Sequence, residues 1–326
     1  MTLRSWLRTA LGLGWLVLTS CSGEPTQPVT GSTGTTRSGA LESNTWITRR
    51  NYPSYWADLS SATVADAAGE SVLYAIGGSG ETRACLGRVR AYNAATDTWR
   101  RRADLPLALC GLNGAGVIQG KIYVSGGVTS SGRREPTAAL FVYDPTTNAW
   151  TRKRDMPEAG SGGITGVIQG KLYVVTVNRA GVAKFFRYSP ATDTWSRLPR
   201  TDYWWLGGGG GVIGGKLYLI AQAVKVYDPA MNRWTTEAPL PGDIHGSSVV
   251  LRGKLYVIGA DTRTGSEVPG IFAYDPAINS WTRTRLPVAL QDSYNIHAAS
   301  RVFVDGEPRA EIVGGGPPGN NLQYVP

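Results

Sequence analysis

GVIQGKIYV at residues 116–124 and YDPTTNAW at residues 143–150 form one unit of a pattern that recurs along the chain. In the first segment, two apolar runs are separated by a Gly-containing pair, which is the short-range signature of a tight β-hairpin. In the second, Pro presets one backbone angle, and the Asp and Asn side chains close a turn between two further strands. Each unit therefore predicts four short strands, which we call a, b, c and d.

The unit repeats with the same internal spacing. The hairpin returns as GVIQGKLYV at 166, GVIGGKLYL at 211 and VVLRGKLYV at 249. A Tyr is followed seven residues later by a Trp at Tyr92/Trp99, Tyr143/Trp150, Tyr188/Trp195, Tyr227/Trp234 and Tyr274/Trp281. Because a single repeat cannot bury its own apolar face, we expect these aromatic residues to pack between neighbouring repeats rather than to bind a ligand.

The repeat resembles the kelch motif, whose hallmarks are a diglycine after strand b and the spaced Tyr and Trp on strands c and d. Diglycines stand at Gly77-Gly78, Gly126-Gly127 and Gly314-Gly315. Three units depart from this feature, with Thr176-Val177, Ala221-Gln222 and Gly259-Ala260 in its place. The resemblance covers residues 43–326 and implies an all-β, six-bladed, kelch-type β-propeller, a repeat architecture with a period near 50 residues.

The two chain ends complement each other. The last unit supplies strands a, b and c (NIHAASRVFV, AEIVGGG and NLQYV) and stops before any Trp. The missing strand d is found at the start, where SNTWITR carries Trp46 in the same setting as the other strand-d tryptophans. We therefore expect the N-terminal strand to close the last blade, which removes the free sheet edges of an open ring.

The first residues read as an export signal. Arg4 and Arg8 are followed by a short apolar stretch, TALGLGWLVLTS at residues 9–20, as in a secretory signal peptide. The apolar run is too short to span a bilayer as a helix. Leu18-Thr19-Ser20-Cys21 resembles a bacterial lipobox, which implies cleavage before Cys21 and lipidation of its sulfur. An ordinary secreted protein with a chance Cys near its cleavage site is the alternative.

These features predict three parts of the chain: a lipoprotein signal peptide over 1–20, a flexible Ser/Thr/Gly/Pro tether over 21–42, and the propeller over 43–326. We expect an exported protein of the cell envelope, held at the membrane by the lipid on Cys21. By analogy with lipoprotein sorting, Ser22 after the Cys favours the outer membrane.

Charge and motifs exclude several function classes. The formal net charge is +9, and it falls to +7 once Arg4 and Arg8 are removed, with no block of five or more Lys or Arg. We interpret this charge as solubility plus attraction to acidic polymers, and we expect no nucleic-acid partner. No HExxH or GxSxG motif occurs, and the Gly207–Gly211 run lacks the Lys-Ser/Thr of a P-loop. We expect no cofactor, no metal and a monomeric ring.

In propellers of this kind the d–a and b–c loops share one face around the central channel, and here those loops are uneven in length and charge. Non-repeated Trp and Tyr beside several Arg suit stacking on sugar rings and pairing with carboxylate or phosphate. We expect this face to bind a carbohydrate or other acidic glycan, or a protein partner. The predicted ligand-binding residues are Arg83, Arg133, Arg134, Arg179, Trp204, Trp205, His245, Arg263, Tyr294 and His297.

Other interpretations of the same loops stay open. Trp204 and Trp205 could plug the channel mouth, with the Arg side chains as solvated loop charges. A metal or acid–base pair at His245 and His297, the two histidines of the chain, is conceivable, although a packing role for these side chains is favoured. The alternative enzyme is a sugar mutarotase or epimerase of the periplasmic kelch type acting on an acidic sugar. It would need an acid near an Arg at the mouth, with Glu81, Glu135 and Glu267 as candidates.

The cysteines suit an oxidising compartment. Cys21 is assigned to the lipid, which leaves Cys85 in the first b–c loop and Cys110 at the start of the following strand a. Both positions fall on the same face of neighbouring blades, so we predict a disulfide between them. Two buried small apolar side chains are the alternative.

Overall fold

The computed structural model describes residues 44–52, 57–130, 134–201, 209–221, 223–242, 244–261, 268–285, 296–314 and 320–326. The chain divides into two units, residues 1–40 and Leu41–Pro326. The predicted signal peptide, the lipidation site Cys21 and the tether lie outside the described residues. Within the described residues, no helix is long and apolar enough to cross a membrane.

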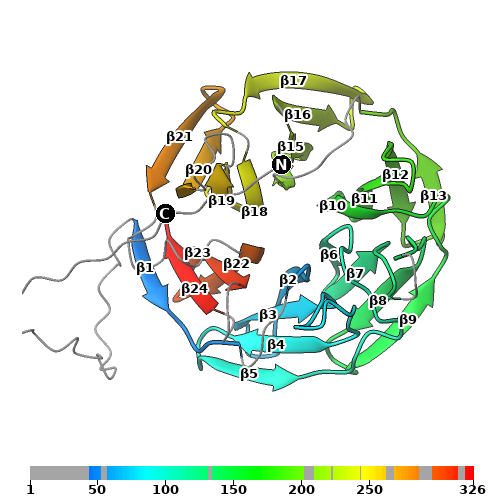
Figure 1. The fold of residues 1–326 in the computed structure, drawn as a ribbon, viewed down its shortest axis with the longest axis horizontal. Helices are drawn as coiled ribbons and strands as arrows, with labels where there is room; N and C mark the ends of the chain where they lie inside the picture. Colours follow the sequence, from blue (N-terminus) through cyan, green and yellow to red (C-terminus); the bar gives the residue numbers. More distant parts are fainter. Residues whose placement is uncertain are drawn as a thin grey trace, which may run out of the picture. The chain divides into compact units, whose positions relative to one another are not determined.

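The second unit is all-β, and its described strands form six four-stranded antiparallel sheets around a central axis, as Figure 1 shows. Blade 1 contains β2 (Ser60–Ala65), β3 (Ser71–Ile76), β4 (Val89–Asn93) and β5 (Thr98–Arg101). Blade 2 contains β6 (Ala115–Ile118), β7 (Lys121–Ser125), β8 (Leu140–Asp144) and β9 (Ala149–Lys153). Blade 3 contains β10 (Ser161–Ile168), β11 (Lys171–Val177), β12 (Ala183–Ser189) and β13 (Thr194–Arg197).

The remaining blades follow the same order from the axis outward. Blade 4 contains β14 (Gly210–Ile213), β15 (Lys216–Ile220), β16 (Ala223–Asp228) and β17 (Arg233–Pro239). Blade 5 contains β18 (Ile244–Leu251), β19 (Lys254–Asp261), β20 (Val268–Asp275) and β21 (Ser280–Arg285). Blade 6 contains β22 (Ile296–Val304), β23 (Glu307–Gly314), β24 (Asn320–Val325) and, as its outermost strand, β1 (Thr45–Thr48).

The predicted closure of the ring is therefore confirmed. β1 pairs antiparallel with β24 from the other end of the chain, with Trp46 opposite Tyr324, and the two strands lie side by side in Figure 1. The pairing of β1 with β24 satisfies backbone groups that β24 would expose in an open ring.

The Tyr–Trp spacing of the sequence becomes a direct cross-strand pair in each blade. The strand-c Tyr is buried, and its ring lies 4.9–5.3 Å from the ring of the Trp opposite it on strand d. The pairs are Tyr92/Trp99, Tyr143/Trp150, Tyr188/Trp195, Tyr227/Trp234, Tyr274/Trp281 and Tyr324/Trp46. The expectation that these residues build the packing between blades is confirmed, because the half-buried indoles pack against the apolar clusters between blades.

An Asn or Asp in the c–d turn ties each of several blades to the one before it. Asn148 adopts a left-handed backbone conformation, with φ of 53°, and its Oδ1 accepts from the Tyr143 hydroxyl at 2.7 Å and from the N–H of Ala103 at 2.9 Å. The carbonyl of Ala103 in turn accepts from Trp150 Nε1 at 2.9 Å. Both backbone groups of a residue in one blade are thus held by the next blade. The arrangement repeats at Arg50 with Asp97 and Trp99, and at Arg154 with Asp193 and Trp195.

A second Tyr, on strand b, completes the contact between neighbouring blades. The strand-b Tyr of each of blades 1–5 lies 5.6–6.2 Å, ring to ring, from the strand-c Tyr of the following blade. The pairs are Tyr74/Tyr143, Tyr123/Tyr188, Tyr173/Tyr227, Tyr218/Tyr274 and Tyr256/Tyr324. Offset and tilted ring pairs of this kind add stability beyond the area that they bury.

Blade 6 replaces the strand-b Tyr with Glu311. The strand register makes the positions equivalent, because Ala310 pairs with Tyr324 as Leu255 pairs with Tyr274 in blade 5. Glu311 is fully buried, and burial raises the pKa of its carboxyl to about 8. The hydrogen bond from Gln323 Nε2, at 2.9 Å, and the positive charge of Arg49 act against that rise. Arg49 and Arg309 both donate to Gln323 Oε1, so blade 6 carries a buried polar network toward blade 1.

Candidate functional site

In blades 1–3 the d–a connections and the b–c loops lie side by side, as expected. Short antiparallel bridges join Ala57 to Ser79, Cys110 to Val128, and Thr137 to Gly160. Backbone hydrogen bonds also run around this end of the blades: the Gly111 N–H donates to the Asp58 carbonyl at 3.1 Å. The Gly162 N–H donates to the Gly111 carbonyl at 2.8 Å. We call this rim of the ring the channel mouth, and it is built from backbone that is fixed by hydrogen bonds.

Behind the mouth lies a cavity of about 660 Å³, lined by the innermost strand of every blade. Its described lining alternates Gly, Ser and Thr with aliphatic residues, and its charged members are Asp58 and Arg301. The hydroxyl-bearing residues are Ser60, Ser61, Thr63, Thr165, Ser247, Ser248 and Ser300. Such a lining offers many short hydrogen-bonding groups and little apolar surface, which suits a hydroxyl-rich ligand.

Asn113 supports the cavity wall between blades 2 and 3. It is fully buried, and its Oδ1 accepts from the Gly163 N–H at 3.1 Å and from the Thr176 hydroxyl at 2.8 Å. Its backbone carbonyl accepts from the hydroxyl of Thr165, a lining residue, at 2.8 Å. A Cβ on Gly126 would lie 2.2 Å from the Asn113 amide nitrogen, so the first residue of that diglycine must lack a side chain.

The predicted disulfide is present at the mouth. Cys85 and Cys110 are bonded, with their Cα atoms 5.0 Å apart, and both side chains are buried. The bond joins the b–c loop of blade 1 to the start of strand a in blade 2. The Cys85 N–H also donates to the Ser130 hydroxyl in the b–c loop of blade 2. The loops of the two blades are therefore held together covalently and by hydrogen bonds.

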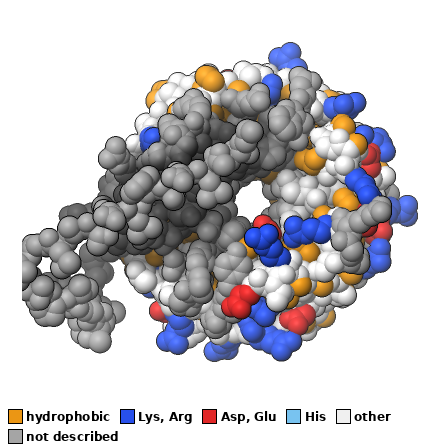
Figure 2. Space-filling view, viewed as in Figure 1, with side chains coloured by type: hydrophobic (Ala, Val, Ile, Leu, Met, Phe, Trp, Pro, Cys, Tyr) orange, Lys and Arg blue, Asp and Glu red, His pale blue; other side chains and the backbone are white. Residues whose placement is uncertain are grey.

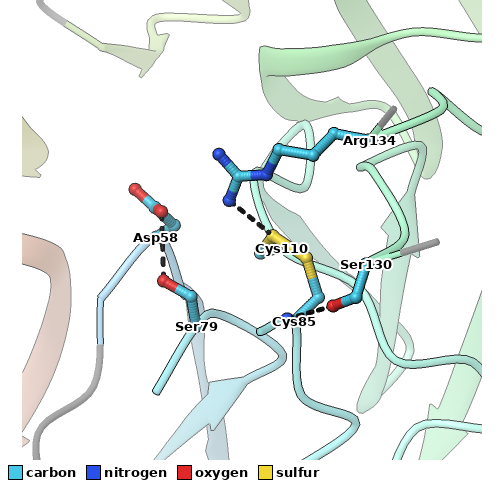
Figure 3. Close-up of a disulfide and its surroundings, with 6 residues drawn as sticks. All are labelled: Asp58, Ser79, Cys85, Cys110, Ser130 and Arg134. Atoms are coloured by element: carbon cyan, nitrogen blue, oxygen red, sulfur yellow. Dashed lines mark hydrogen bonds between the residues drawn. A yellow bond between two sulfur atoms is a disulfide. The ribbon is translucent and has the colours of Figure 1, made fainter. Parts of the chain in front are cut away.

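Arg134 and Asp58 both lie near this disulfide. Arg134 Nη2 donates to Cys110 Sγ at 3.3 Å, and the Ser79 hydroxyl donates to Asp58 Oδ2 at 3.2 Å. In Figure 3 the guanidinium and the carboxylate both extend over the same side of the disulfide. Both residues are exposed, and both have left-handed backbone angles, with φ of 52°. Basic and acidic side chains also gather beside the central opening in Figure 2.

The other described arginines of the predicted site differ from one another. Arg83 is exposed and has φ of 59° in the b–c loop of blade 1, and it forms no ion pair with a described residue. Arg179, from the b–c loop of blade 3, donates from Nη1 to both carboxylate oxygens of Glu135 in blade 2, at 2.7 and 2.6 Å. This pair is exposed, with 63% and 47% of the two side chains accessible. The structure thus leaves Arg83 and Arg134 available to a ligand and pairs Arg179 within the protein.

For the remaining predicted site residues, the structure describes no side chain. Arg133, Trp204, Trp205, Arg263 and Tyr294 lie outside the described residues. His245 and His297 lie on β18 and β22, the innermost strands of blades 5 and 6, but only their backbone is described. No group of three or more His, Cys, Asp or Glu among the described residues could hold a metal ion.

Comparisons with known proteins agree with this architecture. Residues 110–157 match the family model of the Kelch motif. The chain is 33% identical to human Kelch-like protein 34 over 223 residues, which is 66% of this chain and 28% of that protein. It is 32% identical to mouse Kelch-like protein 35 over 134 residues, 41% of this chain and 21% of that protein. The chain therefore spans less than a third of these relatives.

A solved structure titled "Structure of YjhT" superposes with a TM-score of 0.65 at 17% identity, over 84% of this chain and 95% of that one. At this identity the likeness concerns the fold. Together with the Tyr–Trp register and the diglycines, the comparisons identify the protein as a kelch-repeat β-propeller with six blades. Propellers of this class generally mediate binding, while the ligand depends on the site grafted onto the fold.

Proposed function

We propose that the channel mouth binds the acidic end of a glycan, with sugar hydroxyls directed to the cavity and a carboxylate directed to the arginines. The observation that carries the proposal is the pair Arg83 and Arg134, two exposed cations without an ion-pair partner among the described residues. Both arginines lie in b–c loops, at the end of the blades that forms the channel mouth. Behind the mouth is the hydroxyl-lined cavity of about 660 Å³.

The chemistry of the mouth supports this ligand class. A guanidinium binds a carboxylate through two parallel N–H donors, which gives both strength and orientation. The Asp58 carboxylate lines the cavity and can accept from sugar hydroxyls, while the Gly-rich lining lets a ligand approach the backbone closely. Binding that combines one charge-assisted contact with many hydroxyl contacts is selective for acidic over neutral sugars.

A glycan array tests the proposal, with Arg134→Ala and Trp204→Ala as variants and Arg101→Ala as the matched control. Arg101 is on the outer strand β5, where it pairs with Asp104 at 2.8 Å. We expect acidic glycans to bind the wild type and the control, and to bind Arg134→Ala at least about tenfold more weakly, the loss typical of one charged contact. Unchanged binding in both test variants would remove this site and would leave a protein partner as the ligand of the propeller.

One observation favours an enzymatic alternative, a mutarotase or epimerase acting on an acidic sugar. That activity needs an acid near an Arg at the mouth, and Asp58 and Arg134 extend over the same side of the disulfide (Figure 3). Of the acids expected from sequence, Glu135 is paired with Arg179 and Glu267 lies outside the described residues. Anomer exchange of acidic sugars, followed by NMR with purified protein and with Asp58→Asn, tests the alternative. Exchange no faster than in buffer removes it.

We also infer that the protein is exported to the cell envelope and lipid-anchored at Cys21. The support is the sequence of residues 1–21, with its basic start, short apolar stretch and Leu-Thr-Ser-Cys ending. Mass spectrometry of the mature protein from a membrane fraction tests this inference. The expected N-terminal residue is an acylated Cys21, and Cys21→Ser should release the protein from the membrane. An unmodified or uncleaved N-terminus in the wild type would contradict the anchor.

A further inference from the structure

A groove of about 690 Å³ lies between blades 1 and 2, at the end of the blades opposite the channel mouth. Its walls come from the a–b turns of both blades, near Asp66 and Gly120, and from the c–d turn of blade 2 near Thr146. Strand d of blade 1 forms the side wall with Thr98, Arg100 and Arg102. The groove shares no lining residue with the channel cavity, so it is a separate feature.

The groove contains two arginines that form no ion pair with a described residue. Arg100 is exposed. Arg102 is half-buried and hydrogen-bonds the neutral Tyr74 hydroxyl, while its Nε is buried without a partner. The third cation of the groove, Lys121, is already paired with Asp144 at 2.8 Å.

The acids of the groove reduce its net charge to +1 but form no ion pair with either arginine. Asp144 pairs with Lys121, and Asp66 Oδ1 accepts from the N–H groups of Ala68 and Glu70, both at 2.9 Å, in its own turn. A desolvated guanidinium without a counterion is unfavourable, and an added anion relieves that cost.

The same two positions in the other blades show that these arginines are particular to blade 1. Counted one and three residues after the strand-d Trp, the equivalents are Thr151/Lys153, Ser196/Leu198, Thr235/Glu237, Thr282/Thr284 and Ile47/Arg49. The neighbouring groove between blades 2 and 3 is larger, at about 800 Å³, but carries Thr151 and Lys153 there. Size and net charge therefore do not distinguish the groove between blades 1 and 2, but the kind of cation does: it has two guanidinium groups where the neighbouring groove has the ammonium groups of Lys153 and Lys171.

Blade 6 provides the most direct comparison. Arg49 corresponds to Arg102, and Glu311 stands where blade 1 has Tyr74. Blade 6 thus links Arg49 through Gln323 to the buried carboxyl of Glu311, whereas Arg102 has the Tyr74 hydroxyl beside it. The internal polar network around Arg49 has no equivalent at Arg102, and there the groove is open to solvent-borne ligands.

We propose that the groove between blades 1 and 2 is a second binding site, which takes a single acidic sugar unit with its carboxylate held by Arg100 and Arg102. The hydroxyl groups of Tyr74, Thr96 and Thr98 and the amide of Asn93 line the same groove and match the hydroxyls of a sugar ring. A volume of about 690 Å³ is within the usual range of small-ligand sites. The proposal does not depend on the function of the channel mouth.

Titration calorimetry with glucuronate tests the groove, with glucose and inorganic phosphate as comparison ligands. The measurements use Arg134→Ala as the background, so that a contribution from the channel mouth is removed. The test variant adds Arg100→Gln with Arg102→Gln, and the matched control adds Arg101→Gln, whose side chain lies between the two in sequence but pairs with Asp104 instead. Circular dichroism and thermal melting verify that each variant is folded.

We expect glucuronate to bind the background and the Arg101→Gln control alike, and to bind the double variant at least about tenfold more weakly, as for loss of a charge-assisted contact. Glucose should bind more weakly than glucuronate in the background and in the Arg101→Gln control, and this difference should disappear in the double variant. No glucuronate binding, or equal binding in the double variant, would overturn the site. Phosphate binding as tight as glucuronate would overturn the sugar assignment. Each result is independent of whether glycans bind at the mouth.

Discussion

The contact between blades 6 and 1 closes the ring, and it has the same strand register as the contact between blades 1 and 2. The side chains differ, because the first contact is polar and the second is aromatic. Between blades 1 and 2, Tyr74 lies against Tyr143, ring centre to ring centre at 5.6 Å. Between blades 6 and 1, the equivalent position is the buried carboxyl of Glu311, bonded to Gln323. The backbone is the same, so the side chain alone decides whether the contact is a general aromatic one or a polar one that needs particular partners.

The difference has a consequence for specificity. A strand-b Tyr packs against the strand-c Tyr that every blade carries, and blades 1–5 are interchangeable in this respect. Glu311 Oε2 accepts from Gln323 and the carboxyl lies in the field of Arg49, and Arg49 follows β1 at the other end of the chain. A buried carboxyl left without such partners is strongly destabilising, so the polar contact favours closure with β1 in place.

The largest effect is expected from breaking the aromatic contact. Tyr143→Ala removes a fully buried ring that touches both Tyr74 and Trp150, and it should lower the free energy of unfolding by about 4 kcal/mol, as for other large-to-small core substitutions. Urea unfolding measures the change. Tyr143→Phe keeps the ring and loses the hydrogen bond to Asn148, so it should cost about 1 kcal/mol. Equal losses in both variants would show that the ring contact is unimportant.

The polar contact at Glu311 should make the free energy of unfolding depend on pH. The folded protein raises the pKa of Glu311 to about 8, whereas an unfolded Glu titrates near pH 4.3. The folded state therefore holds this proton more tightly, and the associated stability is fully present below about pH 4 and is lost as the pH rises through about 8. Between those limits the free energy of unfolding of the wild type, relative to Glu311→Gln, should fall by between about 2 and 5 kcal/mol.

The reference variant matters because other groups titrate in the opposite sense. Side-chain hydrogen bonds with Lys121 and Tyr188 lower the pKa of Asp144 and Asp193, respectively, so these acids stabilise at higher pH. Subtracting the Glu311→Gln curve cancels their contribution, since those residues are unchanged. A difference curve that is flat from pH 4 to pH 8 would mean that Glu311 titrates like an exposed acid.

The contact between blades 1 and 2 is further distinguished by its disulfide. Replacing both cysteines, Cys85→Ser with Cys110→Ser, frees a loop of 25 residues and should lower the free energy of unfolding by about 3 kcal/mol in the chain-entropy account. Thermal melting of the wild type with and without reductant provides an independent reading. If neither reduction nor the double variant moves the melting temperature, the loops of blades 1 and 2 are held by their other contacts.

The smallest effect is expected at the exposed ion pair between blades 2 and 3. Glu135→Gln removes the carboxylate that binds Arg179, but 63% of the Arg179 side chain and 47% of the Glu135 side chain are accessible. Solvent screens such pairs, so stability should change by less than about 1 kcal/mol, and less still at high salt. Denaturation at two salt concentrations checks this. If Glu135→Gln lowered the free energy of unfolding as much as Tyr143→Ala, exposed contacts would matter as much as buried ones in this protein.

Much of the fold could be predicted from sequence because its determinants are local. The Gly-containing hairpins and the Tyr–Trp spacing predict the strand order within each blade. The last blade lacks a strand d of its own, which identifies β1 as the strand that completes it. The turn Asn or Asp two residues before each Trp was equally visible. The hydrogen bond from this turn residue to the preceding blade could not be predicted, because the N–H that donates to Asn148 belongs to Ala103, much earlier in the chain.

The candidate sites depended on three-dimensional arrangement to a greater degree. Arg100-Arg101-Arg102 looks like a run of solvated charge, and only strand alternation places the first and third in a groove. Glu311 is an ordinary polar residue until the ring closes over it. At the mouth, the arginines and the disulfide were anticipated from loop composition, whereas Asp58 was missed because one acid before a strand carries no recognisable pattern.

The pairing of β1 with β24 also sets an order of events during biosynthesis. Asn44 and Tyr324, which are joined by a hydrogen bond of 2.7 Å, lie 280 residues apart, so β1 leaves the ribosome well before its partner β24. Blades 1–5 can assemble from neighbouring segments as they emerge, but blade 6 must wait until β24 has been made. Premature termination anywhere before residue 320 would leave β1 an unpaired strand, and an unpaired strand is a template for aggregation.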